Sequence, residues 1–165
     1  LNELHWLIDS SARNNDVDSC IGILNGDHKA LMKGRVYSRT IRKNLVKLLL
    51  RISSEVSEMN NIQYFFTTNN MIKGLACGFS IDWFLNDKKP IFAFYKKDEL
   101  IHLSARGNQN LVENGLNLST CVSKACKNFE GSGGGHAIAA GGRFKKKYFK
   151  DFLQNVDNIV LSQLS

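Results

Sequence analysis

A change in hydrophobic periodicity near residue 60 constrains the fold of this chain more than any other feature. From Tyr37 to about Met59, apolar residues recur at the three- and four-residue spacing that predicts one long amphipathic helix. Beyond Asn61, the apolar runs shorten to the length of strands and shorter helices. This change predicts an α/β (α+β) fold, in which residues 61–165 form a mixed β-sheet flanked by helices and residues 1–60 form a helical connector arm.

Local patterns place the remaining elements. The predicted strands are Gln63–Thr67, Pro90–Tyr95 and Leu100–Arg106, with a hairpin turn at Asp98-Glu99. The predicted shorter helices are Leu4–Ile8, Val17–Leu24, Gly74–Leu85, Leu111–Phe129 and Lys145–Leu164, with a turn at Asn25-Gly26-Asp27. The aromatic residues expected on buried faces are Phe79, Phe92, Phe94 and Phe152.

Length and composition limit the chain to one ordinary domain, or to a small domain with a helical connector. Of its 165 residues, 43% are hydrophobic and 22% charged, the balance of a globular protein. No apolar run approaches the ~20 residues of a membrane span and no signal peptide is recognisable, so we expect a cytoplasmic, nucleoid-associated protein without a membrane partner. The first residue is Leu1 rather than Met, and we therefore expect a piece of a longer polypeptide.

The cysteines and histidines lack the spacing of a metal site. The four cysteines form no C-x-x-C pair, and the four histidines are scattered along the chain. We expect reduced, mostly buried thiols and no metal bound by these residues.

Positive charge is concentrated in two segments of a chain whose net charge is +7. Between Lys29 and Arg51, eight basic residues occur without any Asp or Glu, and those at positions 39, 43, 47 and 51 form a stripe along the predicted long helix. A second cluster, at residues 143–150, follows a glycine-rich stretch. A solvated surface and contact with phosphate groups both remain open for the stripe. The candidates for backbone contact are Lys43, Lys47, Arg51, Lys145 and Lys146.

The glycine-rich stretch from Gly131 to Gly142 is the most informative motif. Three consecutive glycines, Gly133, Gly134 and Gly135, permit positive φ and predict a nest of main-chain N–H groups that would bind an oxyanion. His136 would add a side-chain donor at the same place. A flexible linker is the alternative, but it would not need a histidine followed by a run typical of a buried strand.

The motif G-G-G-H-x-x-A-A-G at residues 133–141 resembles the signature of the DHH-associated domain, the second half of DHH-family phosphoesterases. In that family the glycine loop and its histidine contact the substrate phosphate, as does a strand that ends in Ser-x-Arg, present here as Ser104-Ala105-Arg106. Residues two apart on a strand share one face, so Ser104 and Arg106 can bind the same phosphate.

The N-terminal third is similar to the connector of RecJ-like single-strand exonucleases. There an N-A-x-G-R motif supplies an arginine to the pocket for the 5′-terminal phosphate, which would correspond to Arg13. This sequence departs from that motif, because Ser10 stands where Asn is usual and Ala12 where Gly is usual.

The resemblance also indicates what this chain lacks. DHH enzymes hold two divalent metals, Mn or Mg, in a cluster of Asp and His residues, whereas the one adjacent Asp-His pair here, Asp27-His28, has no companion ligands. We therefore assign no catalytic residue to the chain. The expected function is to bind substrate within a metal-dependent, single-strand-specific 5′→3′ exonuclease whose DHH domain lies elsewhere in the same polypeptide.

Two other functions share this resemblance. One is the tRNA-binding C-terminal domain of alanyl-tRNA synthetases, whose glycine run is typically followed by Arg-Pro rather than His. The other is a non-catalytic replication scaffold of the Cdc45 type, for which GINS-type replisome proteins would be partners. Inactive members tend to lose the phosphate-binding motifs, and both motifs are intact here.

Overall fold

The computed structural model describes residues 3–83 and 85–165, which form two compact units that meet between Lys47 and Leu48. The first unit contains α1 (Glu3–Arg13), α2 (Val17–Leu24) and the first part of α3 (His28–Glu55). The helix predicted at Val17–Leu24 and the turn before α3, where Gly26 has a φ of 77°, are confirmed. The helix predicted at Leu4–Ile8 is present but extends over Glu3–Arg13.

Asp16 and Asp27 stabilise the N-terminal ends of α2 and α3, respectively. Asp16 is the N-cap of α2 and accepts a hydrogen bond from the Ser19 N–H at 3.1 Å, and its carboxylate also pairs with Lys33 at 2.6 Å. The pKa of Asp16 is lowered, first by Lys33 and then by the bonds from Ser19. Asp27 accepts a hydrogen bond from the Ala30 N–H at 2.8 Å.

The long helix differs from its predicted range of residues 37–59. α3 begins at His28, because the carboxylate of Asp27 satisfies a main-chain donor of its first turn and no proline interrupts the following residues. It ends at Glu55, because the next residues pair into the sheet as β1 (Ser57–Glu58).

The second unit contains a six-stranded sheet within the described residues, in the order β1-β2-β3-β4-β6-β5. The strands that follow β1 are β2 (Gln63–Phe66), β3 (Ile91–Lys97), β4 (Leu100–Arg106), β5 (Ser132–Gly135) and β6 (Ala139–Lys145). β2 and β3 run parallel and the other pairs are antiparallel, so the mixed sheet and the α+β class are confirmed. Asp98, with a φ of 51°, lies in the predicted hairpin turn between β3 and β4.

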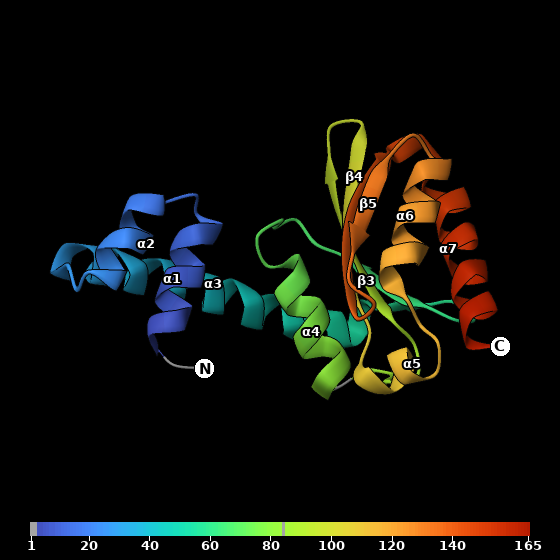
Figure 1. The fold of residues 1–165 in the computed structure, drawn as a ribbon, viewed down its shortest axis with the longest axis horizontal. Coiled ribbons are helices and arrows are strands. Elements are labelled where there is room, and N and C mark those ends of the chain that lie inside the picture. The colour runs from blue at the N-terminus through green and yellow to red at the C-terminus, as the bar shows by residue number, and fades with distance from the viewer. Residues whose placement is uncertain (1–2, 84) are drawn as a thin grey trace. The chain divides into compact units, whose positions relative to one another are not determined.

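Helices lie on both faces of this sheet (Figure 1). α4 (Lys73–Trp83) lies on one face, and α6 (Leu118–Asn128) and α7 (Phe149–Leu164) lie on the other. The aromatic core is on the side of α7, where the rings of Phe144 and Phe152 stack at 3.8 Å and Phe92 and Phe94 are fully buried. Phe79 was expected to be buried as well, but it is 37% exposed because α4 turns it away from the sheet.

Two predicted helices are shorter than expected. The segment 111–129 is divided into α5 (Gln109–Glu113) and α6, because Gly115 has a φ of 106° and Asn117 caps α6 by accepting a bond from the Thr120 N–H. The segment 145–164 begins as the end of β6 and a short 3-10 helix, η1 (Lys146–Tyr148), before α7 starts.

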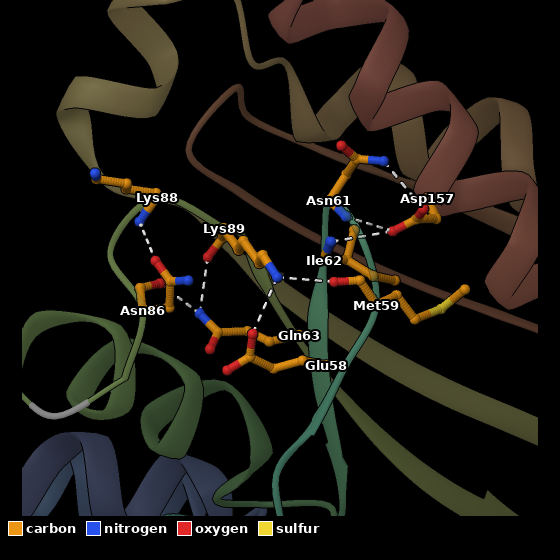
Figure 2. Close-up of polar contacts among 9 residues, drawn as sticks. All are labelled: Glu58, Met59, Asn61, Ile62, Gln63, Asn86, Lys88, Lys89 and Asp157. Carbon is orange, nitrogen blue, oxygen red and sulfur yellow. Dashed lines mark hydrogen bonds and ion pairs between the residues drawn. The ribbon is translucent and has the colours of Figure 1, made fainter.

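Asp157 joins α7 to the sheet through three hydrogen bonds (Figure 2). This buried carboxylate accepts from the Asn61 N–H at 2.8 Å, the Asn61 side-chain amide at 3.0 Å and the Ile62 N–H at 3.1 Å. Nearby, the Gln63 side-chain amide donates to the carbonyl oxygens of Asn86 and Lys89, which fixes the loop before β3. These bonds satisfy the Asp157 carboxylate and the Gln63 side-chain N–H groups where β2 enters the core, whereas Gln63 Oε1 is buried without a partner.

In the described part of the chain, no helix combines the length and the apolar character needed to cross a bilayer.

Candidate phosphate-binding face

Ser104 and Arg106 lie two residues apart on β4, and their side chains point to the face that carries α4. The first turn of α4 lies beside them: a methyl group at Gly74 would be 3.4 Å from Arg106 Nη2 and 3.6 Å from Ser104 Oγ. Arg106 Nη1 donates a hydrogen bond to the Ala105 carbonyl oxygen at 2.9 Å, and both side chains are half-buried. A hydroxyl and a guanidinium beside a helix N-terminus make a combination that suits an anion.

The glycine-rich stretch is a strand, and the predicted nest is wrong in its geometry. Ser132–Gly135 form β5, an edge strand paired with β6, and only Gly135 of the three consecutive glycines has a positive φ, 147°. Successive N–H groups of a strand point in opposite directions along the sheet, so these groups do not converge on one point. The contact of Gly133, Gly134 and Gly135 with phosphate stays a prediction.

The glycines of β5 and β6 instead serve the two faces of the sheet differently. On one face, a methyl group at Gly133 would approach Val122 of α6 to 2.7 Å, so the absent side chain permits close packing. On the other face, Gly134 lies opposite Gly141, which in turn lies opposite Ser104. A methyl group at Gly134 would meet no atom within 4 Å. These two glycines therefore form an open floor beside Ser104.

His136 closes the hairpin between β5 and β6. Its N–H donates to the Ala139 carbonyl oxygen at 2.7 Å, and the Ala139 N–H returns a bond to the His136 carbonyl oxygen at 3.2 Å. Ala139 is also the cross-strand partner of Arg106, so His136 lies on the Arg106 face, about 10 Å away between main chains. Its imidazole is exposed. Arg106 and His136 can thus approach one ligand from opposite sides.

Main-chain hydrogen bonds fix the tip of that hairpin. The Gly107 N–H donates to the Ile138 carbonyl oxygen at 2.9 Å, and the Leu118 N–H donates to the Ala137 carbonyl oxygen at 2.9 Å. Gly107 directly follows Arg106 and Leu118 begins α6, so the loop that carries His136 is held to the strand that carries Arg106.

The same face continues past Ser104 to His102. His102 lies opposite Tyr95 on one side and Arg143 on the other, and Arg143 lies opposite Ser132. A shallow depression of about 460 Å³ lies here, lined by His102, Ser132, Gly133, Gly141, Gly142 and Arg143. His102 was not predicted as a site residue, although the strand alternation that paired Ser104 with Arg106 also includes residue 102.

The charge on this face is positive. The pKa of His102 is lowered, first by partial burial and then by the nearby cations Lys73, Arg143 and Lys97. The segments that form β3, β4, β5 and β6 contain no Asp or Glu. Lys73, the first residue of α4, was not predicted as a site residue, because its proximity to β4 depends on tertiary packing.

The other predicted contact residues belong to α1, α3, β6 and η1. Arg13 pairs with Asp9 at 2.7 Å in the first unit, and Lys43 and Lys47 are exposed on α3. Arg51 is exposed but engaged, because it pairs with Glu55 at 2.9 Å and donates to the Phe66 carbonyl oxygen at 3.2 Å. Lys145 ends β6 and Lys146 begins η1. The roles of all these residues remain predictions.

The described residues contain no metal cluster, and three of their cysteines are buried thiols. Within 3–83 and 85–165, no group of three or more His, Cys, Asp and Glu side chains is placed to hold a metal ion. All four cysteines there are free, and burial raises the pKa values of Cys77, Cys121 and Cys126 to about 12.

Comparison with known proteins identifies the family of this sheet and its motifs. The model of the DHHA1 domain matches residues 61–162. The chain belongs to the DHHA1 domain family. Over 161 residues, this DHHA1 protein is 34% identical to the uncharacterized protein MJ0831 of Methanocaldococcus jannaschii, a match that covers 98% of this chain and 35% of the relative. The chain thus spans about a third of the length of that relative.

Solved structures of low sequence identity share the fold. RecJ from Thermus thermophilus, solved with Mn²⁺, has a TM-score of 0.75 and 12% identity, over 94% of this chain and 23% of RecJ. CDC45 from Entamoeba histolytica has a TM-score of 0.70 and 9% identity, over 96% of this chain and 37% of CDC45. The resemblance to a RecJ-like DHH-associated domain is confirmed at the level of fold and family.

Proposed function

We propose that the open face of β4, β6 and β5 binds a phosphate of single-stranded DNA or RNA, as the substrate-holding part of a DHH-type phosphoesterase. The observation that carries this proposal is the register of the sheet. Through this register, Ser104 and Arg106 share one face with His136, although His136 is 30 residues beyond Arg106 in the sequence. Only one β-strand, β6, separates them in the sheet.

The chemistry of that face fits a phosphodiester. Arg106 offers a planar set of N–H donors, Ser104 a hydroxyl and His136 an imidazole, all of which donate to phosphate oxygens. Lys73, Lys97 and Arg143 add positive charge around them. β3, β4, β5 and β6 contribute no Asp or Glu to this face, and its positive charge would attract a polyanion.

Hydrolysis by two metal ions would require a ligand cluster that the described residues do not form. The residues present do not fit a two-metal centre, since no ligand cluster occurs in the described segments. We propose that a DHH domain of the same polypeptide supplies the Mn or Mg ions and carries out 5′→3′ single-strand exonuclease chemistry. Residues 61–165 would hold the substrate and residues 1–60 would connect them to that domain. The length of MJ0831, about two thirds of which lies outside the match, is compatible with such a domain.

A double-mutant cycle tests the shared phosphate. Arg106→Gln and His136→Gln should each weaken binding of a 5′-phosphorylated single strand about ten- to a hundredfold, the range for losing a charge-assisted hydrogen bond. The double mutant should lose less than the product of the two effects, because both residues hold one group. Fluorescence anisotropy at fixed low salt measures the affinities. Lys127→Gln is the control, because Lys127 is exposed on α6 on the opposite face.

Either of two results would contradict the proposal: single mutants with unchanged affinity, or losses that multiply fully in the double mutant. Hydrolysis of the same strand by the longer polypeptide with Mn²⁺ separates an exonuclease from a Cdc45-like scaffold, which would bind the strand without cutting it.

A further inference from the structure

The rings of Tyr95 and His102 lie on the same face of the sheet as Ser104 and Arg106. They are cross-strand partners on β3 and β4, their ring centroids are 6.2 Å apart, and both side chains are half-buried. Many other sheet aromatics, including Phe92, Phe94 and Phe144, are fully buried on the side of α7. A ring pair that keeps part of its surface open to solvent is available to a ligand.

A side-chain-free floor lies diagonally across from His102, because Gly141 and Gly134 are in register with Ser104. The depression there has a volume of about 460 Å³, and its lining includes Gly141 and Arg143. Gly141 is the cross-strand neighbour of Gly134, and a methyl group added at Gly134 would meet no atom within 4 Å. The floor is therefore made of peptide planes, with His102 and Arg143 at its edge. A planar group can lie on such a floor without displacing a side chain.

The depression adjoins the proposed phosphate position. His102 and Ser104 are two residues apart on β4, so their Cα atoms are about 7 Å apart along the strand. That distance is one that a single nucleotide can span. Arg143, in the row of His102, would then lie near the next phosphate of the strand.

We propose that this depression is a nucleoside subsite, in which a base of the single strand stacks on the His102 ring, with Tyr95 behind that ring and Arg143 at the adjoining phosphate. The inference rests on the proposed function, because a base is placed here only if Ser104 and Arg106 hold the neighbouring phosphate. Stacking on a ring tolerates every base, so the subsite gives affinity without sequence preference.

The electrostatics of His102 agree with this role. Partial burial and the nearby cations lower the pKa of His102, which favours the uncharged form of its ring. A purely structural pairing of Tyr95 with His102 would account for the contact between the rings. It would not account for the glycine floor or for the cations gathered around the depression.

A walk of abasic sites tests the subsite with the 165-residue chain. The probes are 5′-phosphorylated single strands of equal length, one intact and the others each lacking a single base at successive positions from the 5′ end. For the wild type, one position should show a loss of about five- to a hundredfold, the range for one stacked base. His102→Ala should show a similar loss on the intact strand and no further loss on the strand abasic at that position. His102→Phe should retain the affinity of the wild type, and His28→Ala, an exposed histidine on α3, is the control.

Two outcomes would overturn the subsite: a loss that is equal at every abasic position, or His102→Ala with the affinity of the wild type on the intact strand. If thermal denaturation shows that His102→Ala is unfolded, the abasic walk on the wild type and the affinity of His102→Phe test the subsite instead. The proposed phosphate site is judged separately by Arg106→Gln. If binding depends on Arg106 but no single abasic position weakens it more than the others, the subsite is excluded and the phosphate site is retained.

Discussion

Gly74→Ala should separate stability from binding at the phosphate-binding face. The new methyl group would lie 3.4 Å from Arg106 Nη2 and 3.6 Å from Ser104 Oγ, which are ordinary contact distances, so no protein atom must move. Alanine is a better helix former than glycine by about 1 kcal/mol in helix interiors and by less at Gly74, the second residue of α4, so the variant should be as stable as the wild type or slightly more stable. A ligand oxygen between the two side chains would lose its space. Loss of one or both hydrogen bonds should weaken binding about ten- to a hundredfold.

The assay combines thermal denaturation with anisotropy on a 5′-phosphorylated single strand. Gly78→Ala makes the same chemical change one turn later in α4, where an added methyl group meets no atom within 4 Å. It should gain similar stability and keep the affinity of the wild type. Equal affinities of Gly74→Ala and Gly78→Ala would refute the placement of the phosphate between Ser104 and Arg106.

Three further changes test other parts of the molecule. Asp157→Ala leaves the buried N–H groups of Asn61 and Ile62 without their acceptor and should lower the free energy of unfolding by about 3 kcal/mol in urea titrations, whereas the exposed Asp151→Ala in the same helix should cost under about 1 kcal/mol. The pKa of Asp16 is lowered in the folded state, so the contribution of its carboxylate to stability is present above about pH 4 and is lost as the pH falls further. Asp16→Asn should therefore weaken the acid dependence of the melting temperature in circular dichroism melts. An unchanged dependence would exclude a role for the ion pair with Lys33. Replacing Lys43 and Lys47 together by Ala should flatten the salt dependence of single-strand binding by about 0.7 per lost phosphate contact, and an unchanged slope would identify the stripe as solvated surface.

The elements with one clear periodicity could be predicted from the sequence. The alternation of Leu100–Arg106 indicated β4 and put Ser104 and Arg106 on one face, because the period of a strand is a local property. The range predicted for α2 is the observed one. The single helix predicted over residues 111–129 failed where a local signal was overlooked, since Asn114-Gly115 is a turn sequence and Gly115 has positive φ.

The geometry of the glycine run could not be predicted in the same way. Glycine permits both a nest and a strand, and pairing with β6 decides between them. Likewise, Lys73 and Arg143 join the face of Ser104 only through the packing of α4 and the register of β6. Sequence periodicity gives the face of each strand, but the choice of neighbours depends on tertiary contacts.

The hairpin tip that precedes β6 is held by its carbonyl oxygens rather than by its side chains. Ala137 and Ile138 contribute only main-chain acceptors to the bonds with Leu118 and Gly107. Most amino acids provide the same acceptor, so natural variation at positions 137 and 138 can proceed without shifting the neighbouring imidazole. Related chains are thus free to diversify the surface around His136, and with it the molecules that meet this edge, while the anchoring of the loop stays the same.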